Sequence, residues 1–500
     1  MSRMTEQITL FWRKHPALLY GVAFMLGCAF ALTATPWLFF PALALWGIAP
    51  FANRELLIRL TLALLLSITA YTHVKFYYTF PDYPLTGTVG EGIFTIDSLT
   101  QKKTHFGAFW AYKGTLKSFG PFRNLPVTLS IPIRPDYKRP LANRDYLVKG
   151  VLKQSSQCTF HLKCDYNTPW GEIEGTHSFA ESRHAAKKAL AGFIKSKIDN
   201  QRSATLLAGL ATGDFDDNHM QFQFSRFGLQ HIMAISGFHF SILAAFFSFS
   251  LQLFFERKWS SALLIALLST YFLFLGAAPS ILRSWIAIAI LLTGYLIEKQ
   301  GNGLNSLGIG LLAILIFNPL FCLSLGFQFS FAATAAIFLI YPLFDRLLSY
   351  FLKKRALNTA LQMPLLDQHA FVLMSWIRQG IALTLAVNLI ALPMMLYYFH
   401  KFPLLSLFYN LFFPFLISIA MLLLLLGFLC PWVHPINSWF TARVLDLTYN
   451  MPTAYDFTLF VADLSGEWVI VHLTIIFGIS ILALDFNPVG TPQCLIQRRA

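Results

Sequence analysis

Long apolar runs separated by short polar segments dominate this chain of 500 residues. A helix needs about twenty apolar residues to cross the hydrocarbon of a bilayer, so runs of this length predict membrane-spanning helices. The predicted runs are 16–34, 36–51, 55–76, 236–255, 260–278, 281–297, 305–320, 325–344, 379–399, 403–429 and 468–485. A shorter run at 204–213 predicts a re-entrant or interfacial piece. The pattern therefore predicts a polytopic α-helical membrane protein.

Residues 77–180 interrupt this pattern, because no apolar run of spanning length occurs in them. Short alternating, β-branched stretches separated by Gly, Pro, Asn and Asp are typical of β-strands. The predicted strands are 85–89, 92–96, 126–131 and 145–152. About five short strands in about a hundred residues favour a small β-barrel with an OB-like fold.

The distribution of basic residues orients the chain. Only 12% of the residues are charged, against about 25% in soluble domains. Lys and Arg in short loops mark the cytoplasmic side, and they flank the first spans and occur in the loop 345–378. Both sets of basic residues, those beside the first spans and those in 345–378, lie on the cytoplasmic side if the N-terminal segment holds an odd number of spans. Residues 77–180 are then extracytoplasmic, in a multi-pass membrane protein.

These patterns divide the chain into successive parts. We expect an N-terminal membrane segment of about three spans at 1–76, an extracytoplasmic OB-like domain at 77–180, an amphipathic interfacial helix at 181–199, a transmembrane domain at 200–485 and a C-terminal tail at 486–500. The basic face of the interfacial helix suits anionic membrane lipids, and it could instead contact nucleic acid. Membrane lipids are therefore expected partners.

The segment 77–180 is basic, with 12 Lys or Arg against 8 Asp or Glu, and aromatic residues lie between the charges. Single-stranded nucleic acid is bound by such a combination, since cations neutralise phosphates and aromatic faces stack on bases. The candidate residues are Lys102, Lys103, Trp110, Lys113, Lys117 and Arg123. The alternative is that the aromatic residues form the ordinary core and surface of a barrel.

Cys158 and Cys164 lie close together in the same segment, with His161 between them. The spacing matches no strong zinc pattern, and an exported location favours a disulfide between the two cysteines. We therefore expect this disulfide, no metal site and no cofactor.

The segment 227–239 sets polar residues at the start of an apolar run. Polar groups at such a place usually belong to a buried site or a water-filled path. An intramembrane serine protease could use Ser236 with His231 or His239. A transporter of small molecules or cell-wall precursors is another alternative. The chain has no G-x-x-x-x-G-K-[ST] loop for ATP and no H-x-H-x-D-H motif for a two-metal hydrolase.

Four segments together resemble the ComEC competence family: 206–214, 227–239, 279–286 and 318–330. Asn388, Pro393, Asn410 and Pro414 are further similar positions. The resemblance implies a channel for single-stranded DNA in the inner membrane, active in natural transformation. It also implies a DNA receptor outside and an ATP-driven translocase inside. Many members continue into a metallo-β-lactamase-like domain, which does not follow here, so the resemblance implies a transport protein rather than an enzyme.

A polyanion that crosses hydrocarbon needs polar or basic groups along its route. Arg283, just after Pro279 at the expected outer mouth, is the best candidate for contacting phosphate. Other candidates at the entrance are Asp214, His231, Ser236 and His239, with Gln328, Asn388 and Asn410 deeper in. The alternative is that these groups only form hydrogen bonds between helices.

Overall fold

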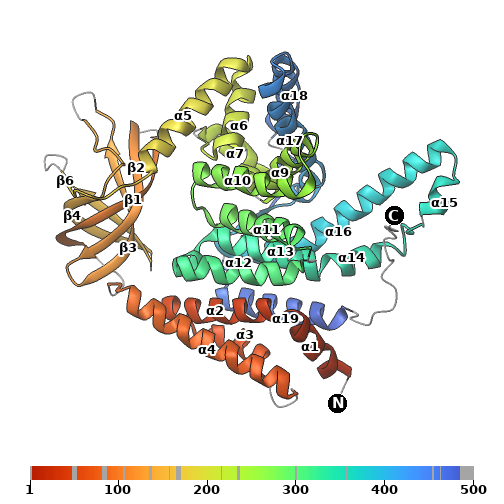
Figure 1. The fold of residues 1–500 in the computed structure, drawn as a ribbon, viewed down its shortest axis with the longest axis horizontal. Coiled ribbons are helices and arrows are strands. Elements are labelled where there is room, and N and C mark those ends of the chain that lie inside the picture. Colours follow the sequence, from red (N-terminus) through yellow and green to blue (C-terminus); the bar gives the residue numbers. More distant parts are fainter. Residues whose placement is uncertain are drawn as a thin grey trace.

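The apolar helices run side by side, and a small β-domain lies at one end of them (Figure 1). This computed structural model describes residues 3–47, 53–81, 87–104, 107–134, 138–156, 158–164, 170–215, 217–233, 237–298, 301–355, 357–452, 455–461 and 463–484. Within these ranges, seven helices are long and apolar enough to cross a membrane, or up to eight if a bent pair forms one span. The predicted multi-span helical architecture is confirmed.

The N-terminal part packs through small residues. It consists of α1 (Arg3–Lys14), α2 (Pro16–Thr33), the 3-10 turn η1 (Pro36–Leu38), α3 (Phe39–Trp46) and α4 (Arg54–Tyr77). Gly27 of α2 lies against the backbone of Ser67 on α4. Gly21 of α2 faces Gly308 of α12 (Gly303–Phe317). Small residues let helix backbones approach closely, which is typical of helix packing in lipid.

The β-domain is a sheet whose pairings follow a closed circuit. Its strands are β1 (Thr88–Thr104), β2 (Gly107–Phe119), β3 (Phe122–Pro132), β4 (Tyr146–Ser156), β5 (Thr159–Cys164) and the short β6 (Gly171–Glu172). β1 pairs with β2 and β4, β3 pairs with β2 and β5, and β5 pairs with β4. The β3–β5 pair is parallel. β1 pairs with β2 along one edge and with β4 along the other, and the β1–β2 register shifts at two places.

Large side chains fill the inside of this domain and join it to the helices. Tyr112 and Phe119 of β2 are among its fully buried residues. Tyr78, which follows α4, stacks on Phe80, and Phe80 stacks on Phe160 of β5. This row of rings fixes the β-domain to the end of α4.

The amphipathic segment predicted at 181–199 forms α5 (Ala180–Lys197). Its apolar residue Ile194 packs with Leu207 of α6 (Gln201–Thr212) and Leu424 of α17 (Ser406–Leu429). α6 is the run predicted to be re-entrant or interfacial, and it is largely buried between other helices. α7 (Asn218–Arg226), α8 (Gln230–Met233) and α9 (Gly237–Gln252) follow.

The central helices follow the predicted apolar runs. They are α10 (Arg257–Leu275), α11 (Pro279–Leu296), α12, the turn η3 (Pro319–Leu323), α13 (Leu325–Leu339), α14 (Tyr341–Leu348), α15 (Leu357–Leu361) and α16 (Leu365–Phe399). The bent pair is α13 and α14, with an angle of 44°. α16 has 35 residues, which exceeds the length that a bilayer core requires.

The C-terminal part contains one helix that the apolar pattern does not predict. After β7 (Lys401–Pro403) and α17 come α18 (Val433–Tyr449), β8 (Thr458–Phe460) and α19 (Gly466–Ala483), and β7 pairs with β8. α18 buries polar side chains that bond to neighbouring helices. Asn437 Nδ2 donates to the Ala420 oxygen of α17 at 3.2 Å, and the amide of Asn200, which precedes α6, donates to Ser438 Oγ at 3.1 Å.

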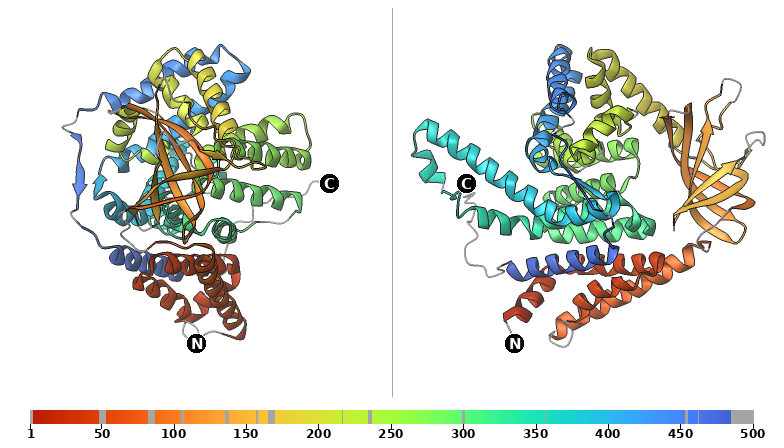
Figure 2. Two further views of the ribbon diagram at one scale, coloured as in Figure 1. Left: turned by 90° about the vertical axis from the view of Figure 1, so that its left-hand side faces the viewer. Right: turned by 180° about the vertical axis from the view of Figure 1, so that it is seen from behind.

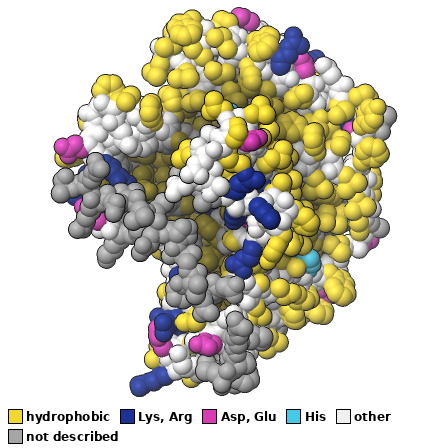
Figure 3. Space-filling view, turned by 90° about the vertical axis from the view of Figure 1, so that its right-hand side faces the viewer, with side chains coloured by type: hydrophobic (Ala, Val, Ile, Leu, Met, Phe, Trp, Pro, Cys, Tyr) yellow, Lys and Arg dark blue, Asp and Glu magenta, His cyan; other side chains and the backbone are white. Residues whose placement is uncertain are grey.

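The two ends of the helices differ. The β-domain follows α4 at one end, whereas α14, α15, the start of α16 and the N-terminus lie at the other (Figure 2). Figure 3 shows the second end face on, and Lys and Arg side chains gather near its centre. Lys353, Lys354 and Arg355, all exposed, follow α14 there. The segments 77–180 and 345–378 thus lie at opposite ends.

Candidate functional site

Gly228 turns the chain in the segment 227–239, which leads from α7 through α8 to α9. Its φ of +66° is a left-handed conformation that glycine adopts without steric cost. A Cβ at this position would lie 2.7 Å from the Cβ of Ser406 on α17. Gly228 therefore both forms the turn and lets α17 approach.

A partly buried ion pair anchors the start of this segment. Arg226 donates from Nε and Nη2 to both carboxylate oxygens of Asp456, at 2.8 and 2.7 Å. Nη2 also donates to the Met451 oxygen at 3.1 Å. The next residue, Phe227, stacks on Tyr409 of α17 with ring centroids 4.5 Å apart. The turn at Gly228 is thus held against α17 and the segment after α18.

The two histidines of this segment have different surroundings. His231 is exposed, and its Nδ1 lies 3.2 Å from the carbonyl oxygen of Gly228. His239, in the first turn of α9, is buried, and its ring lies beside Phe238. Ser236 lies outside the described residues, so the serine–histidine pair stays a prediction.

Arg283, near the start of α11, meets the start of α9. Its Nε donates to Ser330 Oγ of α13 at 2.7 Å. A Cβ at Gly237 would lie 2.8 Å from Nη2 of Arg283 and 2.9 Å from Oγ of Ser284, so the guanidinium occupies the space beside this glycine. Among the described residues, no carboxylate forms an ion pair with Arg283. We call these four residues the arginine cluster.

The arginine cluster joins segments that are far apart in the sequence. The segments are 227–239, 279–286 and 318–330. The cluster lies near the end of the helices that carries the β-domain, because the α10–α11 turn is tied to β1 there. Arg183 of α5 donates from Nη1 to the Asp97 oxygen of β1 at 3.1 Å and from Nε to the Leu273 oxygen of α10 at 3.0 Å.

Two polar side chains in the first turns of α17 have buried oxygen atoms. Among the described residues, neither Ser406 Oγ nor Asn410 Oδ1 has a hydrogen-bond partner. A buried polar atom without a partner costs roughly 1–3 kcal/mol, so both atoms suit a polar ligand or water. Asn410 is a predicted site residue, whereas Ser406 is not, and Ser406 contacts the turn at Gly228.

Three other predicted lining residues form hydrogen bonds elsewhere in the protein. Asp214 accepts from Nζ of Lys187 on α5 at 3.3 Å. Gln328 accepts from the hydroxyl of Tyr398 at 2.5 Å. Asn388 donates to a carbonyl oxygen of its own helix at 2.8 Å. The contact of Gln328 with α16 matches the alternative interpretation, in which such groups form hydrogen bonds between helices, whereas Asn388 bonds within its own helix.

Some of the basic residues predicted to bind single-stranded DNA are exposed on the surface of the β-domain. The exposed cations are Lys102, Lys113 and Arg123. Partial burial, and then the charge of Lys102, lower the pKa of Lys113, so these two cations lie close together. Lys117 instead pairs with Asp145 at 2.7 Å. The side chain of Lys103 lies outside the described part.

Trp110 has partners within the protein. The guanidinium of Arg139 lies 4.5 Å from its ring, and the ring of His184 meets it edge-on at 5.4 Å. Tyr112 and Phe119 are buried in the domain core. For these aromatic residues, the core interpretation describes the contacts better than an open stacking surface.

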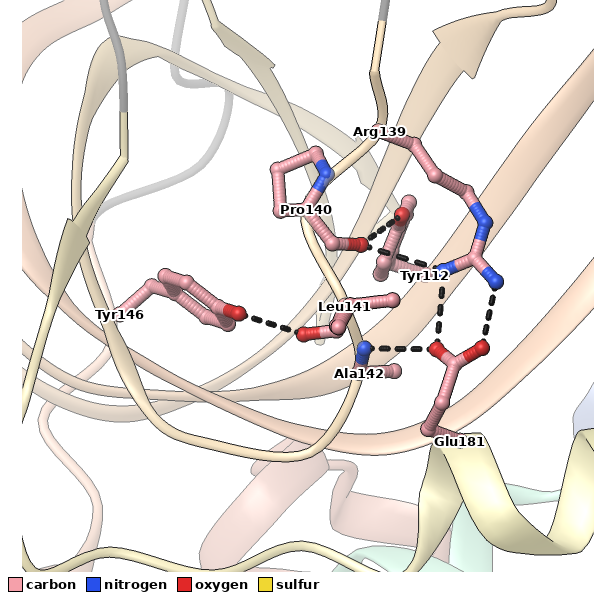
Figure 4. Close-up of polar contacts among 7 residues, drawn as sticks. All are labelled: Tyr112, Arg139, Pro140, Leu141, Ala142, Tyr146 and Glu181. Atoms are coloured by element: carbon pink, nitrogen blue, oxygen red, sulfur yellow. Dashed lines mark hydrogen bonds and ion pairs between the residues drawn. The ribbon is translucent and has the colours of Figure 1, made fainter.

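A polar network joins the β-domain to α5 (Figure 4). Arg139 donates from Nη1 and Nη2 to the carboxylate of Glu181 on α5, at 2.8 and 2.5 Å, and the Ala142 amide donates to the same carboxylate at 2.8 Å. Tyr112 donates from its hydroxyl to the Pro140 oxygen at 2.7 Å. The Arg139 guanidinium lowers the pKa of Glu181 and keeps it ionised.

The expected disulfide is not formed. Cys158 and Cys164 are buried free thiols at the two ends of β5. A strand rises about 3.3 Å per residue, so its ends lie much farther apart than the roughly 4.4–6.8 Å between the Cα atoms of a disulfide. No group of three His, Cys, Asp or Glu side chains suited to a metal occurs in the described ranges.

Several site residues were not predicted from the sequence. Gly237, Ser284 and Ser330 lie within or beside the predicted motifs, but their role depends on which helices meet. The pair of Arg139 and Glu181 joins two predicted domains, and only the fold brings them together. Proximity to the motifs is the one signal that could have identified the serines.

Comparisons with known proteins support the resemblance. The family model described as competence protein matches residues 212–486, which is more than half of the chain. "ComE operon protein 3" of Bacillus subtilis (strain 168) is 27% identical over 223 residues, or 44% of this chain. The match spans 25% of that relative's length. No solved structure matches the chain significantly.

Proposed function

The chain belongs to the competence protein family, and we propose that it is an inner-membrane channel that passes single-stranded DNA into the cytoplasm during natural transformation. The apolar helices supply a membrane-embedded body, and the β-domain stands at the end where DNA would arrive. The proposal includes a DNA receptor outside and an ATP-driven translocase inside. Nuclease activity is not part of it.

In this proposal the β-domain is an OB-like barrel that meets the strand first. The strand order β1-β2-β3-β5-β4, closed by the pairing of β1 with β4, supports that assignment. Lys102, Lys113 and Arg123 would contact phosphates, because they are exposed cations. The aromatic residues that the fold buries would hold the barrel together instead of stacking on bases.

The arginine cluster is the observation that carries the proposal. Arg283 is a cation near the β-domain end, bonded to a serine and paired with no described carboxylate. A guanidinium without a carboxylate partner is suited to bind phosphate through several N–H groups. The three segments that meet there are three of the four on which the family resemblance rests. We infer that Arg283 receives the phosphate backbone at the membrane mouth.

Beyond the arginine cluster, the proposed route uses polar atoms on α8 and α17. His231, Ser406 and Asn410 offer hydrogen-bonding atoms near the turn at Gly228. The exposed cations after α14 stand at the far end, where a strand would leave and a translocase would engage. Cations at both ends attract a polyanion, and the interior needs only polar contacts.

Substitution of Arg283 tests the proposal. Arg283→Ala should reduce transformation and the amount of labelled DNA in the cytoplasm while surface DNA binding stays unchanged. A lost charge-assisted contact of roughly 1.5–3 kcal/mol corresponds to a decrease of roughly ten- to a hundred-fold. Arg283→Lys should retain part of the activity, because the charge is kept.

Arg443→Ala is the matched control, since Arg443 is an exposed arginine on α18 whose partner Asp446 lies on the same helix. All variants must reach the wild-type level in the membrane. Wild-type DNA uptake by Arg283→Ala at that level would show that the route lies elsewhere.

A further inference from the structure

A long cavity of about 810 Å³ lies between α2, α13 and α19. Its lining extends from Leu18 to Thr33 on α2, from Phe327 to Leu339 on α13 and from Ser465 to Leu482 on α19 and the residue before it. Sixteen residues of α2 correspond to about 24 Å of helix, because each residue rises about 1.5 Å. The cavity therefore follows the helices through most of the bilayer core, and an elongated occupant suits it.

The lining is apolar along most of this length and polar at one end. Leu26, Phe331, Ala335 and Leu473 are typical of the apolar part. Most of the polar side chains lie at the last turn of α2, the first turn of α13, the last turn of α16 and the start of α19; they are Thr33, Thr35, Gln328, Tyr397, Tyr398, Ser465 and Glu467. Thr474 lies farther along α19, and its hydroxyl donates to the Ile470 oxygen of the same helix at 2.8 Å. This division between an apolar slot and a polar mouth matches the polarity of a membrane lipid.

The polar mouth lies at the end of the helices that carries the β-domain. Tyr78, which directly precedes that domain, donates from its hydroxyl to Asn318 Oδ1 at 3.4 Å. Asn318 caps the turn η3, and α13 begins just after it. The headgroup of a lipid in the slot would therefore face the outer leaflet, and its chains would point toward α1.

The charge of the mouth selects among possible occupants. Glu467, exposed in the first turn of α19, is the one charged side chain among the described residues that line the cavity. A carboxylate favours an ammonium group and repels phosphate-only headgroups. An apolar slot with a carboxylate also suits a polyanion poorly, so the cavity is distinct from the proposed DNA route.

We propose that this slot binds the acyl chains of an outer-leaflet phospholipid that carries a primary ammonium headgroup. The chains fill the space between the N-terminal helices and α13, and the ammonium group pairs with Glu467. Gln328 of α13 lines the slot, while Ser330 of the same helix bonds Arg283. A bound lipid therefore supports the face of α13 opposite the arginine cluster. The proposal does not depend on DNA transport, because its readout is lipid binding.

The test uses the full chain in vesicles with phosphatidylethanolamine that carries a photoreactive acyl chain. Irradiation should label peptides from α2, α13 and α19. Ala335→Trp fills the slot and should lower the labelling at least several-fold. Ile337→Trp on the same helix is the control, since Ile337 is 40% exposed on the outer surface and does not line the cavity. Equal labelling of both variants and the wild type would overturn the proposal.

The headgroup is tested separately, so the result does not rest on a variant that changes packing. Wild-type protein should be labelled several-fold more by the ethanolamine lipid than by a phosphatidylglycerol with the same chain. Glu467→Gln should abolish this preference, and Glu467→Lys should reverse it. Equal labelling by both lipids in the wild type, or a preference that survives Glu467→Lys, would contradict the assignment of an ammonium headgroup.

Discussion

Gly237 is the residue on which the geometry of the arginine cluster depends most directly. The guanidinium of Arg283 and the hydroxyl of Ser284 lie in the space that a Cβ would occupy. A backbone without a side chain thus lets two helices bring polar groups to one point. This arrangement links the start of α9 to the position of a cation on α11.

We expect Gly237→Ala to reduce DNA uptake several-fold while the protein still reaches the membrane. The added methyl group would lie 2.8 Å from Nη2 of Arg283, so the guanidinium has to move. Labelled DNA in the cytoplasm is the measurement. Gly326→Ala is the control, because a Cβ at Gly326, also within the family-like segments, meets nothing within 4 Å. Similar uptake by both variants would contradict the role of Gly237.

The residues of the site were only partly predictable. Arg283 was predicted because an arginine in an apolar run is costly unless it is paired or functional. Asn388 is also polar within an apolar run, but it donates to its own helix, which no spacing reveals. Nothing in the sequence distinguishes Ser406, and it belongs to the candidate site only because it contacts the turn at Gly228. Long-range packing decides these cases.

Among the elements, α5 has the position that couples the β-domain to the helices. Its first turn carries Glu181, which pairs with Arg139, and Arg183, which bonds both β1 and α10. His184 meets Trp110 in the same turn. The first turn of α5 therefore holds the β-domain against the helices, in addition to the stacked rings after α4.

The contact between the β-domain and α5 should weaken as the pH falls, because His184 then takes up a proton. Burial lowers the pKa of His184 below its ordinary value of 6.5, with Glu181 opposing and Arg139 assisting the shift. The undocked state thus binds protons more readily, so docking weakens as pH falls through the ordinary value and levels off below the lowered one. Hydrogen exchange of 139–146 and 180–187, corrected for intrinsic rates, should accelerate between about pH 7.5 and about pH 5.5.

His184→Phe is the control for this effect. It keeps an aromatic ring near Trp110 but cannot titrate, so the difference between the two pH values should shrink. Glu181 loses its own contribution only at more acidic pH, because Arg139 lowers its pKa below the usual carboxyl range. An equal acceleration in the variant and the wild type would exclude His184 as the cause.

The secondary structure was predictable where side chains follow a simple period. Each predicted apolar run contains a helix, but the helices in 36–51, 236–255 and 305–320 are shorter than the predicted spans, and 325–344 is divided between α13 and α14. β1, β3 and β4 contain predicted strands. β2 was not predicted, because lysines and aromatics mix on it and hide the alternation. α18 was not predicted as an element, since its buried face carries polar residues such as Asn437 and Thr441, which bond each other at 3.0 Å. Tertiary hydrogen bonds replace hydrophobic burial there.

At the scale of the whole molecule, the two ends have different chemistry. One end carries the β-domain, and the other carries the N-terminus, α14 and the exposed cations after it. α19 ends at the second end, on the same side as the N-terminus. Basic residues favour the cytoplasmic side, so we propose that the second end faces the cytoplasm.

Single-cysteine labelling should confirm this orientation. In a background with the native cysteines replaced, Lys149→Cys on β4 should react with an impermeant maleimide added outside intact cells. Lys353→Cys should react only after the membrane is made permeable. Both positions are exposed, so access to the side chain does not limit the reaction. Labelling of both from the same side would overturn the assignment.

Substitutions at the two proposed phosphate sites should impair different steps, because DNA would reach the cations of the β-domain before it reaches the arginine cluster. Lys102→Glu with Lys113→Glu reverses two neighbouring exposed charges on the β-domain. Full-length protein should then bind an oligonucleotide less tightly, and its salt dependence should fall by about 0.7 log units per lost phosphate contact. Lys117→Gln is the control, because Asp145 already neutralises Lys117.

The double variant should lose both DNA binding and uptake, whereas Arg283→Ala should lose uptake alone. Unchanged binding and salt slope in the double variant would remove the β-domain from the route and leave the arginine cluster as its first contact.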